Sequence, residues 1–175
     1  MLMKSEKSTK RNMFPLLSVV YKKWISFKVW WRFKGQVQPS SIINYIDNFR
    51  MGKGSASNDR CWFNARYGIF IGKNTLIGPN VLIQTVDHVI KDFNIEQNSQ
   101  RRNRVEGKKV VIGDDVWIGA NVLILKGSFI PDKCVVGAGT LITEKNCRDL
   151  KPGDIVVNDI KLRKLSNRKN YLEKK

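Results

Sequence analysis

The chain of 175 residues contains a single histidine, His88. Imidazole groups titrate near neutral pH, so a histidine can accept a proton during a reaction and return it. A lone histidine is more often incidental, but His88 ends a series of six-residue repeats directly before a break at residues 89–109. Structureless breaks of this length usually serve as lids or binding arms. These coinciding features make His88 the candidate catalytic residue.

The three cysteines offer no comparable chemistry. Cys61, Cys134 and Cys147 lack CxxC spacing, and together with one histidine they form no recognisable zinc site. We therefore expect no metal and a reduced, cytoplasmic compartment. Cys134 occupies a repeat position that elsewhere holds small or β-branched residues, so it is interpreted as a packing residue.

The repeats that position His88 place Ile or Val at every sixth residue. The residues are Ile71, Ile77, Ile83, Ile112, Ile118, Ile124, Ile130, Val136 and Ile142. Neither a helix nor an ordinary strand has this period. Three short strands per turn of a triangular coil explain it, with the first residue of each repeat pointing inward and successive turns pairing as parallel strands. The glycine that often follows is expected to accommodate the corner conformation.

Three repeats make a turn of 18 residues, which predicts turns at 71–88, 112–129 and 130–147. Residues 51–70 are interpreted as an irregular earlier turn. The expected organisation is an N-terminal segment at 1–40, the coil at 41–160 and a basic tail at 161–175.

The formal charge of +17 lies mostly at the two ends of the chain. Residues 1–35 hold nine Lys or Arg against one Glu, and residues 159–175 hold seven against two acidic residues. These ends are either solvated tails or segments attracted to an anionic surface. The middle of the chain is nearly balanced, so we expect no nucleic-acid partner.

Residues 14–31 are predicted to form a helix with one apolar stripe. The stripe consists of Phe14, Leu17, Val20, Tyr21, Trp24, Phe27 and Trp31. Its interruption by lysines argues against a signal peptide and a membrane span. The helix either caps the coil, because solenoid ends need caps, or rests on anionic lipid.

The runs IGKNTLIGPNVLIQTVDHVI and VVIGDDVWIGANVLILKGSFIPDKCVVGAGTLIT, separated by a polar loop, closely resemble one group of hexapeptide-repeat proteins. The group comprises the maltose and galactoside O-acetyltransferases and related capsule and exopolysaccharide acetyltransferases. The resemblance spans about residues 50–160. It implies an all-β fold, a left-handed parallel β-helix of hexapeptide repeats, with an N-terminal α-helical segment and a loop insertion at about 89–109. The left hand comes from the resemblance alone, because parallel crossovers are otherwise right-handed.

The resemblance also implies roles for individual residues. In this group the histidine at the position of His88 is the general base. Asn58 falls on an acceptor-binding asparagine, although it could equally be a turn residue. An acidic acceptor ligand of the group has no match, and Arg66 lies in that stretch. Asp87 either helps to orient the base or acceptor or is a corner residue.

For the acetyl donor, Trp117 corresponds to a tryptophan beside the pantetheine channel. It should face outward, covered by ligand or by a neighbouring subunit. The remaining expected coenzyme A contacts are Gly119, Ala120, Gly137, Ala138, Thr143, Lys145 and Lys161. The usual Gly-Asn-Pro-Ala-Lys ending of the group is replaced here by VVNDIKLRK, so the C-terminal part of this site is altered.

Together these features predict a homotrimeric, acetyl-CoA-dependent O-acetyltransferase that acts on a sugar or polysaccharide-precursor hydroxyl. Transfer is expected to be direct, because no motif places a Ser or Cys nucleophile with a base. N-acetylation of an amino sugar or antibiotic and a non-catalytic β-helix scaffold are the alternatives. A carbonic anhydrase of the same fold would need several histidine ligands, which excludes it. The expected location is the cytoplasm, with peripheral contact to an anionic membrane through the N-terminal segment.

Overall fold

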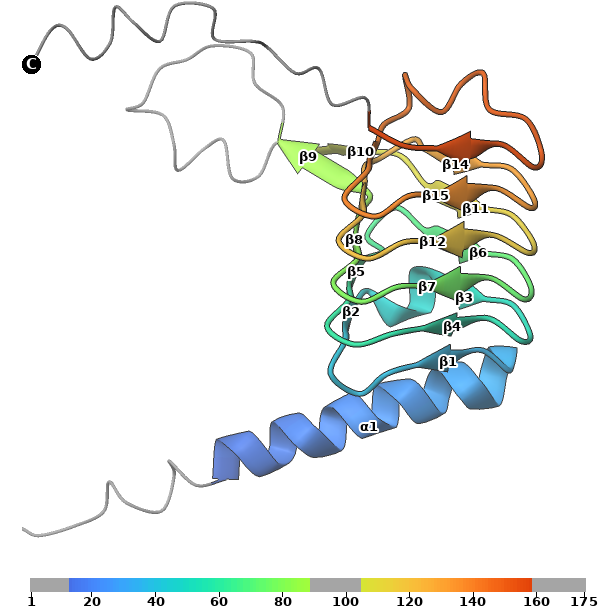
Figure 1. The fold of residues 1–175 in the computed structure, drawn as a ribbon. Helices are drawn as coiled ribbons and strands as arrows, with labels where there is room; N and C mark the ends of the chain where they lie inside the picture. The colour runs from blue at the N-terminus through green and yellow to red at the C-terminus, as the bar shows by residue number, and fades with distance from the viewer. Residues whose placement is uncertain (1–12, 89–104, 159–175) are drawn as a thin grey trace, which may run out of the picture.

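The computed structural model describes residues 13–88 and 105–158. In this part of the chain a helix is followed by a coil with three flat faces, each a parallel sheet (Figure 1). As the chain climbs away from the helix it winds in a left-handed sense, as the resemblance implied. The fold expected from the repeats is therefore confirmed.

Each face of the coil is built from one short strand per turn. The first face contains β1 (Gln36–Val37), β4 (Ala56–Ser57), β7 (Leu76–Ile77), β12 (Trp117–Ile118), β15 (Val135–Val136) and β17 (Ile155–Val156). The second contains β2 (Ile42–Asn44), β5 (Trp62–Asn64), β8 (Leu82–Gln84), β13 (Leu123–Ile124) and β16 (Leu141–Ile142). The third contains β3 (Phe49–Met51), β6 (Ile69–Ile71), β11 (Val110–Ile112) and β14 (Phe129–Ile130).

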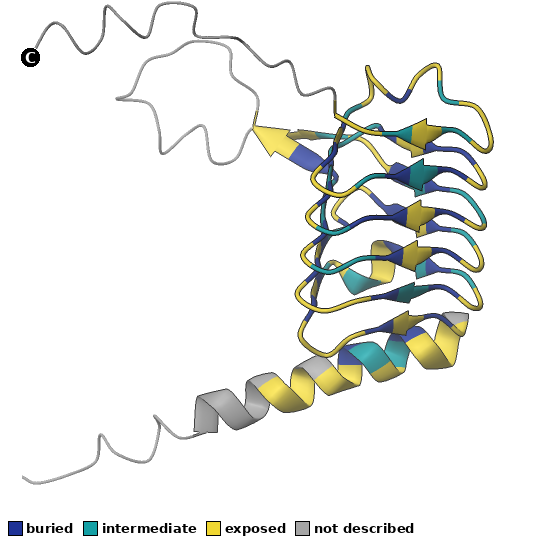
Figure 2. Cartoon of the chain, in the orientation of Figure 1, coloured by how far each residue is buried: buried dark blue, intermediate teal, exposed yellow. Residues whose placement is uncertain are grey.

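The first residue of every repeat points into the coil, as predicted. Ile71 pairs with Ile112, which pairs with Ile130, and the same register continues on the other two faces. All nine of these Ile and Val residues are at most 4% exposed. Their stacking fills the coil with branched aliphatic side chains, and Figure 2 shows the resulting alternation of buried and exposed residues. Cys134 is fully buried among them, in agreement with a packing role.

The reason for the glycines differs from the one expected. The left-handed conformation at the corners is adopted by the fourth residue of a repeat, such as Asn74, Asp115 or Asn121, with φ between 54° and 57°. The glycine in the second position is needed for space instead. A Cβ on Gly113 would lie 2.7 Å from the backbone nitrogen of Asp132 in the next turn, and one on Gly119 would lie 2.6 Å from that of Ala138.

The coil begins earlier than the recognisable repeats. Residues 51–70 form a turn, because Met51 pairs with Ile71 and Phe63 with Ile83. Below it, β1 pairs with β4 and β2 with β5, which adds a further turn from Gln36. This first turn contains the short 3₁₀ helix η1 (Ile46–Asn48).

Helix α1 (Met13–Phe33) lies across the end of this first turn and contacts β1 and β3 (Figure 1). Its buried residues are Ile25 and Val29, at 3% and 0% exposure. The members of the predicted apolar stripe from Val20 to Trp31 are exposed instead. The helix therefore caps the coil, but with a different face from the predicted stripe. Within residues 13–88 and 105–158 no helix has the length and apolar character needed to cross a membrane.

Candidate functional site

His88 does not lie on the coil. The chain leaves the second face after β8 and forms β9 (Val86–His88), which pairs with β10 (Val105–Gly107) as an antiparallel ribbon. We call this ribbon the arm. The repeat prediction held as far as Ile83, which is fully buried, but the last residues of that repeat belong to the arm. The middle of the predicted loop, residues 89–104, lies outside the described residues.

The arm exposes both His88 and Asp87. The backbone N–H of His88 donates a hydrogen bond of 2.8 Å to Oδ1 of Asp87. Asp87 therefore braces the backbone of the histidine. The side chain of His88 is therefore accessible on a two-stranded ribbon outside the coil.

Two ion pairs hold the arm against the turns above it. Lys126 pairs with Glu106, and Nζ of Lys108 binds both carboxylate oxygens of Glu144 at 2.7 and 2.8 Å. The hydrogen bond from Lys108 holds the pKa of Glu144 below its usual range. These four residues were not identified from the sequence, because no motif pairs a loop residue with a residue one turn away.

Lys126 also resolves a conflict of charge on the arm. Glu106 on β10 lies directly opposite Asp87 on β9, and like charges at opposed positions destabilise a strand pair. The ammonium group of Lys126, whose side chain is partly buried at 24% exposure, offsets this repulsion. The position of His88 therefore depends on a lysine from the coil.

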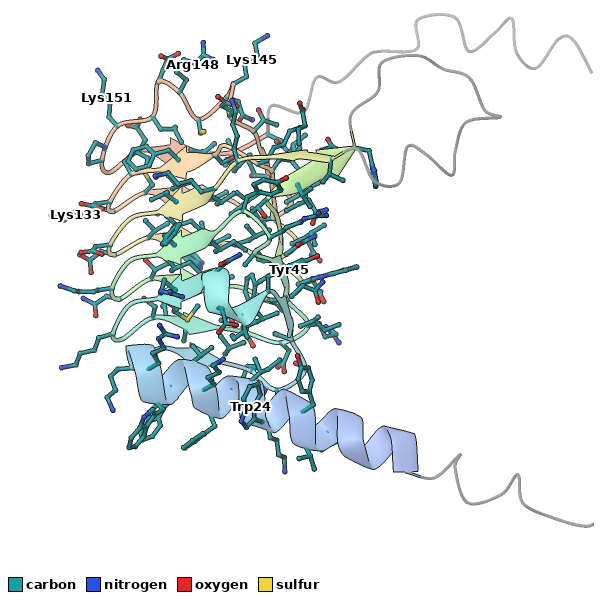
Figure 3. The ribbon with its side chains drawn as sticks, turned by 180° about the vertical axis from the view of Figure 1, so that it is seen from behind. Trp24, Tyr45, Lys133, Lys145, Arg148 and Lys151 are labelled. Atoms are coloured by element: carbon teal, nitrogen blue, oxygen red, sulfur yellow. The ribbon has the colours of Figure 1, made fainter. Side chains whose placement is uncertain are left out.

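A pocket of about 320 Å³ lies beside the arm. Its walls include Asp87 from β9, Gln84 from β8 and Lys126, Thr143 and Lys145 from the turns above. The structure thus brings together Asp87, expected to serve the acceptor, with Thr143 and Lys145, expected to serve coenzyme A. Figure 3 shows Lys145 at the end of the coil opposite to Trp24 of α1.

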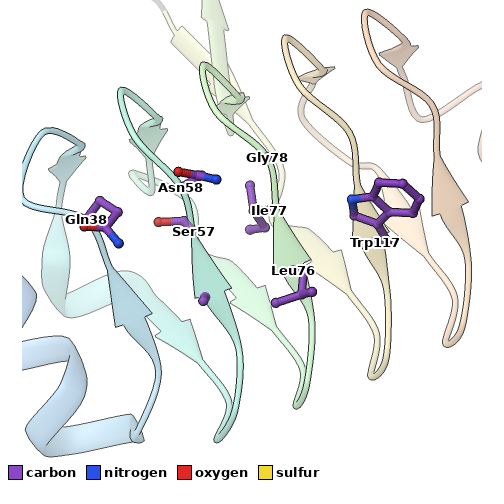
Figure 4. Close-up of a pocket in the computed structure, with 8 residues that line it drawn as sticks. Gln38, Ser57, Asn58, Leu76, Ile77, Gly78 and Trp117 are labelled. Atoms are coloured by element: carbon purple, nitrogen blue, oxygen red, sulfur yellow. The ribbon is translucent and has the colours of Figure 1, made fainter.

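A second pocket, of about 280 Å³, lies on the first face (Figure 4). It contains Asn58 and Trp117, together with Leu76 and Gly78. Trp117 faces outward and is 58% exposed, as its repeat position predicted. Asn58 also serves the turn that was its alternative interpretation, since its Oδ1 accepts the backbone N–H of Asp59 at 3.0 Å.

The expected small contacts continue this pocket along the corner between the first and second faces. Gly119 and Ala120 follow β12, and Gly137 and Ala138 lie directly above them in the next turn. The stacked corner presents backbone with little side chain, which suits an extended ligand arm. Lys161, the last expected contact, lies outside the described residues.

Within one chain the pocket on the first face and the arm do not form a single site. The second face separates Trp117 and Asn58, at the first pocket, from His88 and Asp87 on the arm. Arg66 follows β5 as the arm follows β8, so it lies one turn below the arm at the same corner. Its side chain is exposed there.

The buried thiols cannot substitute for a catalytic base or nucleophile. Burial raises the pKa of the Cys61 and Cys134 thiols above the ordinary value. Cys147 is also buried. A thiol that stays protonated is a poor nucleophile.

Comparison with known proteins agrees with this architecture. A family model described as "Hexapeptide repeat of succinyl-transferase" matches residues 109–144. Galactoside O-acetyltransferase of Lactococcus lactis is 33% identical over 109 residues, covering 62% of this chain and 50% of that protein. The crystal structure of a maltose O-acetyltransferase from Clostridium difficile 630 is 26% identical with a TM-score of 0.59, covering 87% of this chain and 73% of the other.

The chain is thus similar to hexapeptide-repeat acetyltransferases both in its repeats and in its coil. It spans about half the length of the curated relatives it matches. Another member of the fold, an acetyltransferase from Vibrio cholerae crystallised with acetyl coenzyme A, is 22% identical with a TM-score of 0.56, covering 87% of this chain and 82% of the other. Its likeness concerns the fold.

Proposed function

We propose that this chain is an acetyl-CoA-dependent O-acetyltransferase that modifies a hydroxyl of a sugar or polysaccharide precursor, with His88 as the general base. The observation that supports this most is the placement of His88. It stands exposed on an arm that leaves the coil, beside a pocket containing Asp87, Thr143 and Lys145. A coil that served only as a scaffold would need neither the arm nor the ion pair between Lys126 and Glu106 that holds it.

The proposed reaction is a direct transfer. The imidazole of His88 accepts the proton of the acceptor hydroxyl while the hydroxyl oxygen attacks the thioester carbonyl. When the tetrahedral intermediate collapses, the carbon–sulfur bond breaks and the imidazolium returns the proton to the sulfur of coenzyme A. The protonated state of the buried thiols of Cys61 and Cys134 favours this route over an acyl-enzyme.

The donor is proposed to lie along the corner between the first and second faces. Trp117 and Leu76 offer apolar surface there, at 58% and 54% exposure, and the stacked pairs Gly119–Ala120 and Gly137–Ala138 leave the backbone accessible. Thr143 and Lys145 line the pocket beside the arm, so they are proposed to contact the phosphates and pantetheine amides of a donor bound along this corner of a neighbouring subunit. Lys161 is proposed as a further polar contact. Asn58, Asp87 and Arg66 are proposed to bind the acceptor.

We further propose that the active form is a homotrimer, with each site at a seam between subunits. Trp117 and His88 belong to opposite sides of one coil, so a seam in which Trp117 faces the arm of a neighbour would unite them. The first face supports this, because it exposes Leu76, Trp117 and Ile155 in a column of large apolar side chains. The proposed location is the cytoplasm, with the N-terminal segment in peripheral contact with the inner face of the membrane.

The deciding experiment measures acetyl transfer from acetyl-CoA to a panel of sugars, corrected for hydrolysis, with wild type and His88→Ala. We expect turnover to fall by about a hundredfold or more in His88→Ala, the usual range for loss of a general base. Acetyl-CoA binding, measured by calorimetry, should persist. Lys133→Ala, on an exposed corner, is the control and should retain full activity.

Three results would contradict the proposal in different ways. Equal turnover in His88→Ala would remove the histidine from the mechanism. Transfer to amino sugars but not to hydroxyls would indicate an N-acetyltransferase. Absence of acetyl-CoA binding in the wild type would indicate a non-catalytic scaffold.

A further inference from the structure

Helix α1 has an aromatic surface that the coil does not use. We call it the outward face of α1, and it consists of Val19, Val20, Tyr21, Trp24, Phe27, Trp30 and Trp31. These side chains are 44% to 66% exposed. Four of the five aromatic residues among them are Trp or Phe, whose large apolar rings are usually buried.

The rings of the outward face lie in two groups of neighbouring rings on successive turns of the helix. Phe27 lies with its ring centroid 6.1 Å from that of Trp31, and Trp30 lies 6.4 Å from Trp31. Tyr21 stacks on Trp24 at 6.0 Å. Isolated exposed apolar residues are common, but neighbouring rings of this kind usually mark an interaction site.

Cations surround these rings, and α1 contains no acidic residue. Nζ of Lys34 lies 4.8 Å from the centroid of Trp30, and Nζ of Lys28 lies 5.1 Å from that of Trp24. Lys23 is exposed beside them. The surface therefore combines large amphipathic rings with the charges of Lys23 and Lys34, which form no ion pair within the described residues, whereas the charge of Lys28 is paired with Asp47.

We infer that the outward face of α1 docks on an anionic lipid surface, which gives the peripheral contact of the proposed function a defined site. Tyr and Trp favour the boundary between acyl chains and headgroups, where one end of the ring is apolar and the other wet. Lysines at the rim meet anionic headgroups while their stems cover apolar surface. The charge complementarity selects anionic lipid over a neutral surface.

The buried side of α1, together with Lys28 at its edge, fixes the helix in the required orientation. Ile25 and Val29 are buried against the coil, and Nζ of Lys28 binds Oδ1 of Asp47 in η1 at 3.0 Å. The outward face is thus presented without any rearrangement. Deleting α1 would remove Ile25 and Val29 from the core, so substitutions on the outward face alone are the cleaner test.

The test is co-sedimentation of the full chain with vesicles of phosphatidylcholine and phosphatidylglycerol, compared with vesicles of phosphatidylcholine alone. We expect binding to the anionic vesicles only, and weaker binding as salt rises, because the charges are screened beyond about 10 Å at 0.1 M. The variant Phe27→Ser/Trp30→Ser/Trp31→Ser should lower the vesicle partition coefficient about tenfold or more, since burial of one large aromatic side chain alone contributes more than a factor of ten.

A matched pair of charge variants tests the electrostatic part. Lys23→Glu/Lys34→Glu should abolish binding to anionic vesicles. Lys133→Glu/Lys151→Glu makes the same change of charge on exposed corners of the coil and should bind as the wild type does. Each pair contains one lysine in the left-handed conformation, Lys34 at φ 57° and Lys133 at φ 61°, so backbone effects are balanced.

Absence of sedimentation with anionic vesicles at low salt would overturn the inference, as would equal loss in both charge variants. If the wild type does not bind vesicles, and the variant Phe27→Ser/Trp30→Ser/Trp31→Ser forms a smaller oligomer than the wild type, a second copy of the chain covers the outward face instead. Sedimentation requires no acetyl transfer. Assays of the same variants on a soluble acceptor therefore distinguish the two proposals. Loss of vesicle binding with normal acetyl transfer concerns only the lipid contact, and absence of acetyl transfer concerns only the proposed function.

Discussion

At the scale of single residues, the chain separates groups that pack from groups that react. Its cysteines are buried and burial keeps the Cys61 and Cys134 thiols protonated, whereas its one histidine is exposed on a strand outside the coil. Trp117 is a large aromatic residue at an outward repeat position, where its ring is exposed. The chemistry of this protein is therefore expected wherever the repeat pattern is broken or turned outward.

The dependence on pH should distinguish catalysis from folding. If His88 is the base, the rate of the transfer step falls as pH is lowered through the range in which histidines titrate, about 5 to 8. The lowered pKa of Glu144 gives its pair with Lys108 a stabilising effect that is present above the ordinary carboxyl range and is lost only as pH falls through the lower folded value. Single-turnover rates and melting temperatures over the same buffers would separate the two. A rate that is flat across the histidine range would contradict the role of His88.

Trp117 is expected to act on the donor and not on stability. Because its ring is 58% exposed, Trp117→Ala should leave the melting temperature of the chain nearly unchanged. Loss of the apolar contact should raise the KM for acetyl-CoA about tenfold with a smaller change in kcat. Leu141→Ala, an outward position on the second face, is the control. An unchanged KM in Trp117→Ala would place the donor elsewhere.

At the scale of elements, the arm depends on the balance between Asp87, Glu106 and Lys126. Lys126→Met leaves two carboxylates directly opposed, so we expect the arm to loosen and kcat to fall several-fold while the coil keeps its melting temperature. Glu106→Gln in the same chain removes one of the opposed charges and should restore part of the activity. Such a rescue is not expected if Lys126 only touches substrate, and its absence would favour that role.

At the corners of the coil, the need for space at the second repeat position can be tested separately from the left-handed conformation at the fourth position. Gly113→Ala places a methyl group 2.7 Å from the backbone nitrogen of Asp132, so it should cost about 1–3 kcal/mol of stability through overpacking. Asp115→Gly in the same corner replaces a residue at φ 57° with one that adopts this conformation freely, and should change stability far less. Thermal unfolding of the two variants measures the difference. A milder effect for Gly113→Ala than for Asp115→Gly would contradict the steric explanation.

The sequence predicted those elements whose residues repeat at fixed spacing. Ile71, Ile112 and Ile130 stack because each repeat has the same length, so their register follows from counting. The coil was expected from residue 41, whereas its first strand is Gln36–Val37, because Val37 and Ile43 belong to no run of repeats from which the start could be counted. The sequence left open whether the apolar stripe of α1 faces the coil or lipid, because the helix is apolar on two sides, and only the position of the coil decides that Ile25 and Val29 are the buried residues. The pairing of Lys126 with Glu106 depends on the path of the arm, which no local pattern specifies.

At the scale of the whole molecule, the seam between subunits can be tested by complementation. Neither His88→Ala nor Trp117→Ala subunits alone would hold an intact site, but a trimer that contains both would join a normal Trp117 to a normal His88 at some seams. We therefore expect refolded mixtures to regain activity at low acetyl-CoA concentration. Light scattering should give three times the chain mass for the active species. An active monomer, or mixtures no more active than their components, would contradict the shared site.

The position of α1 at one end of the coil determines how far His88 would lie from a membrane on which the helix rests. Two strand spacings of about 4.8 Å separate β2 from β8, where the arm departs, and the helix below adds a diameter of about 10 Å. With the outward face of α1 on lipid, His88 would stand about 20 Å above the headgroups. A sugar joined directly to its lipid carrier could not reach that far, whereas one borne several units out along a growing glycan could. The capping helix would then act as a ruler that selects how far from the membrane a hydroxyl is modified.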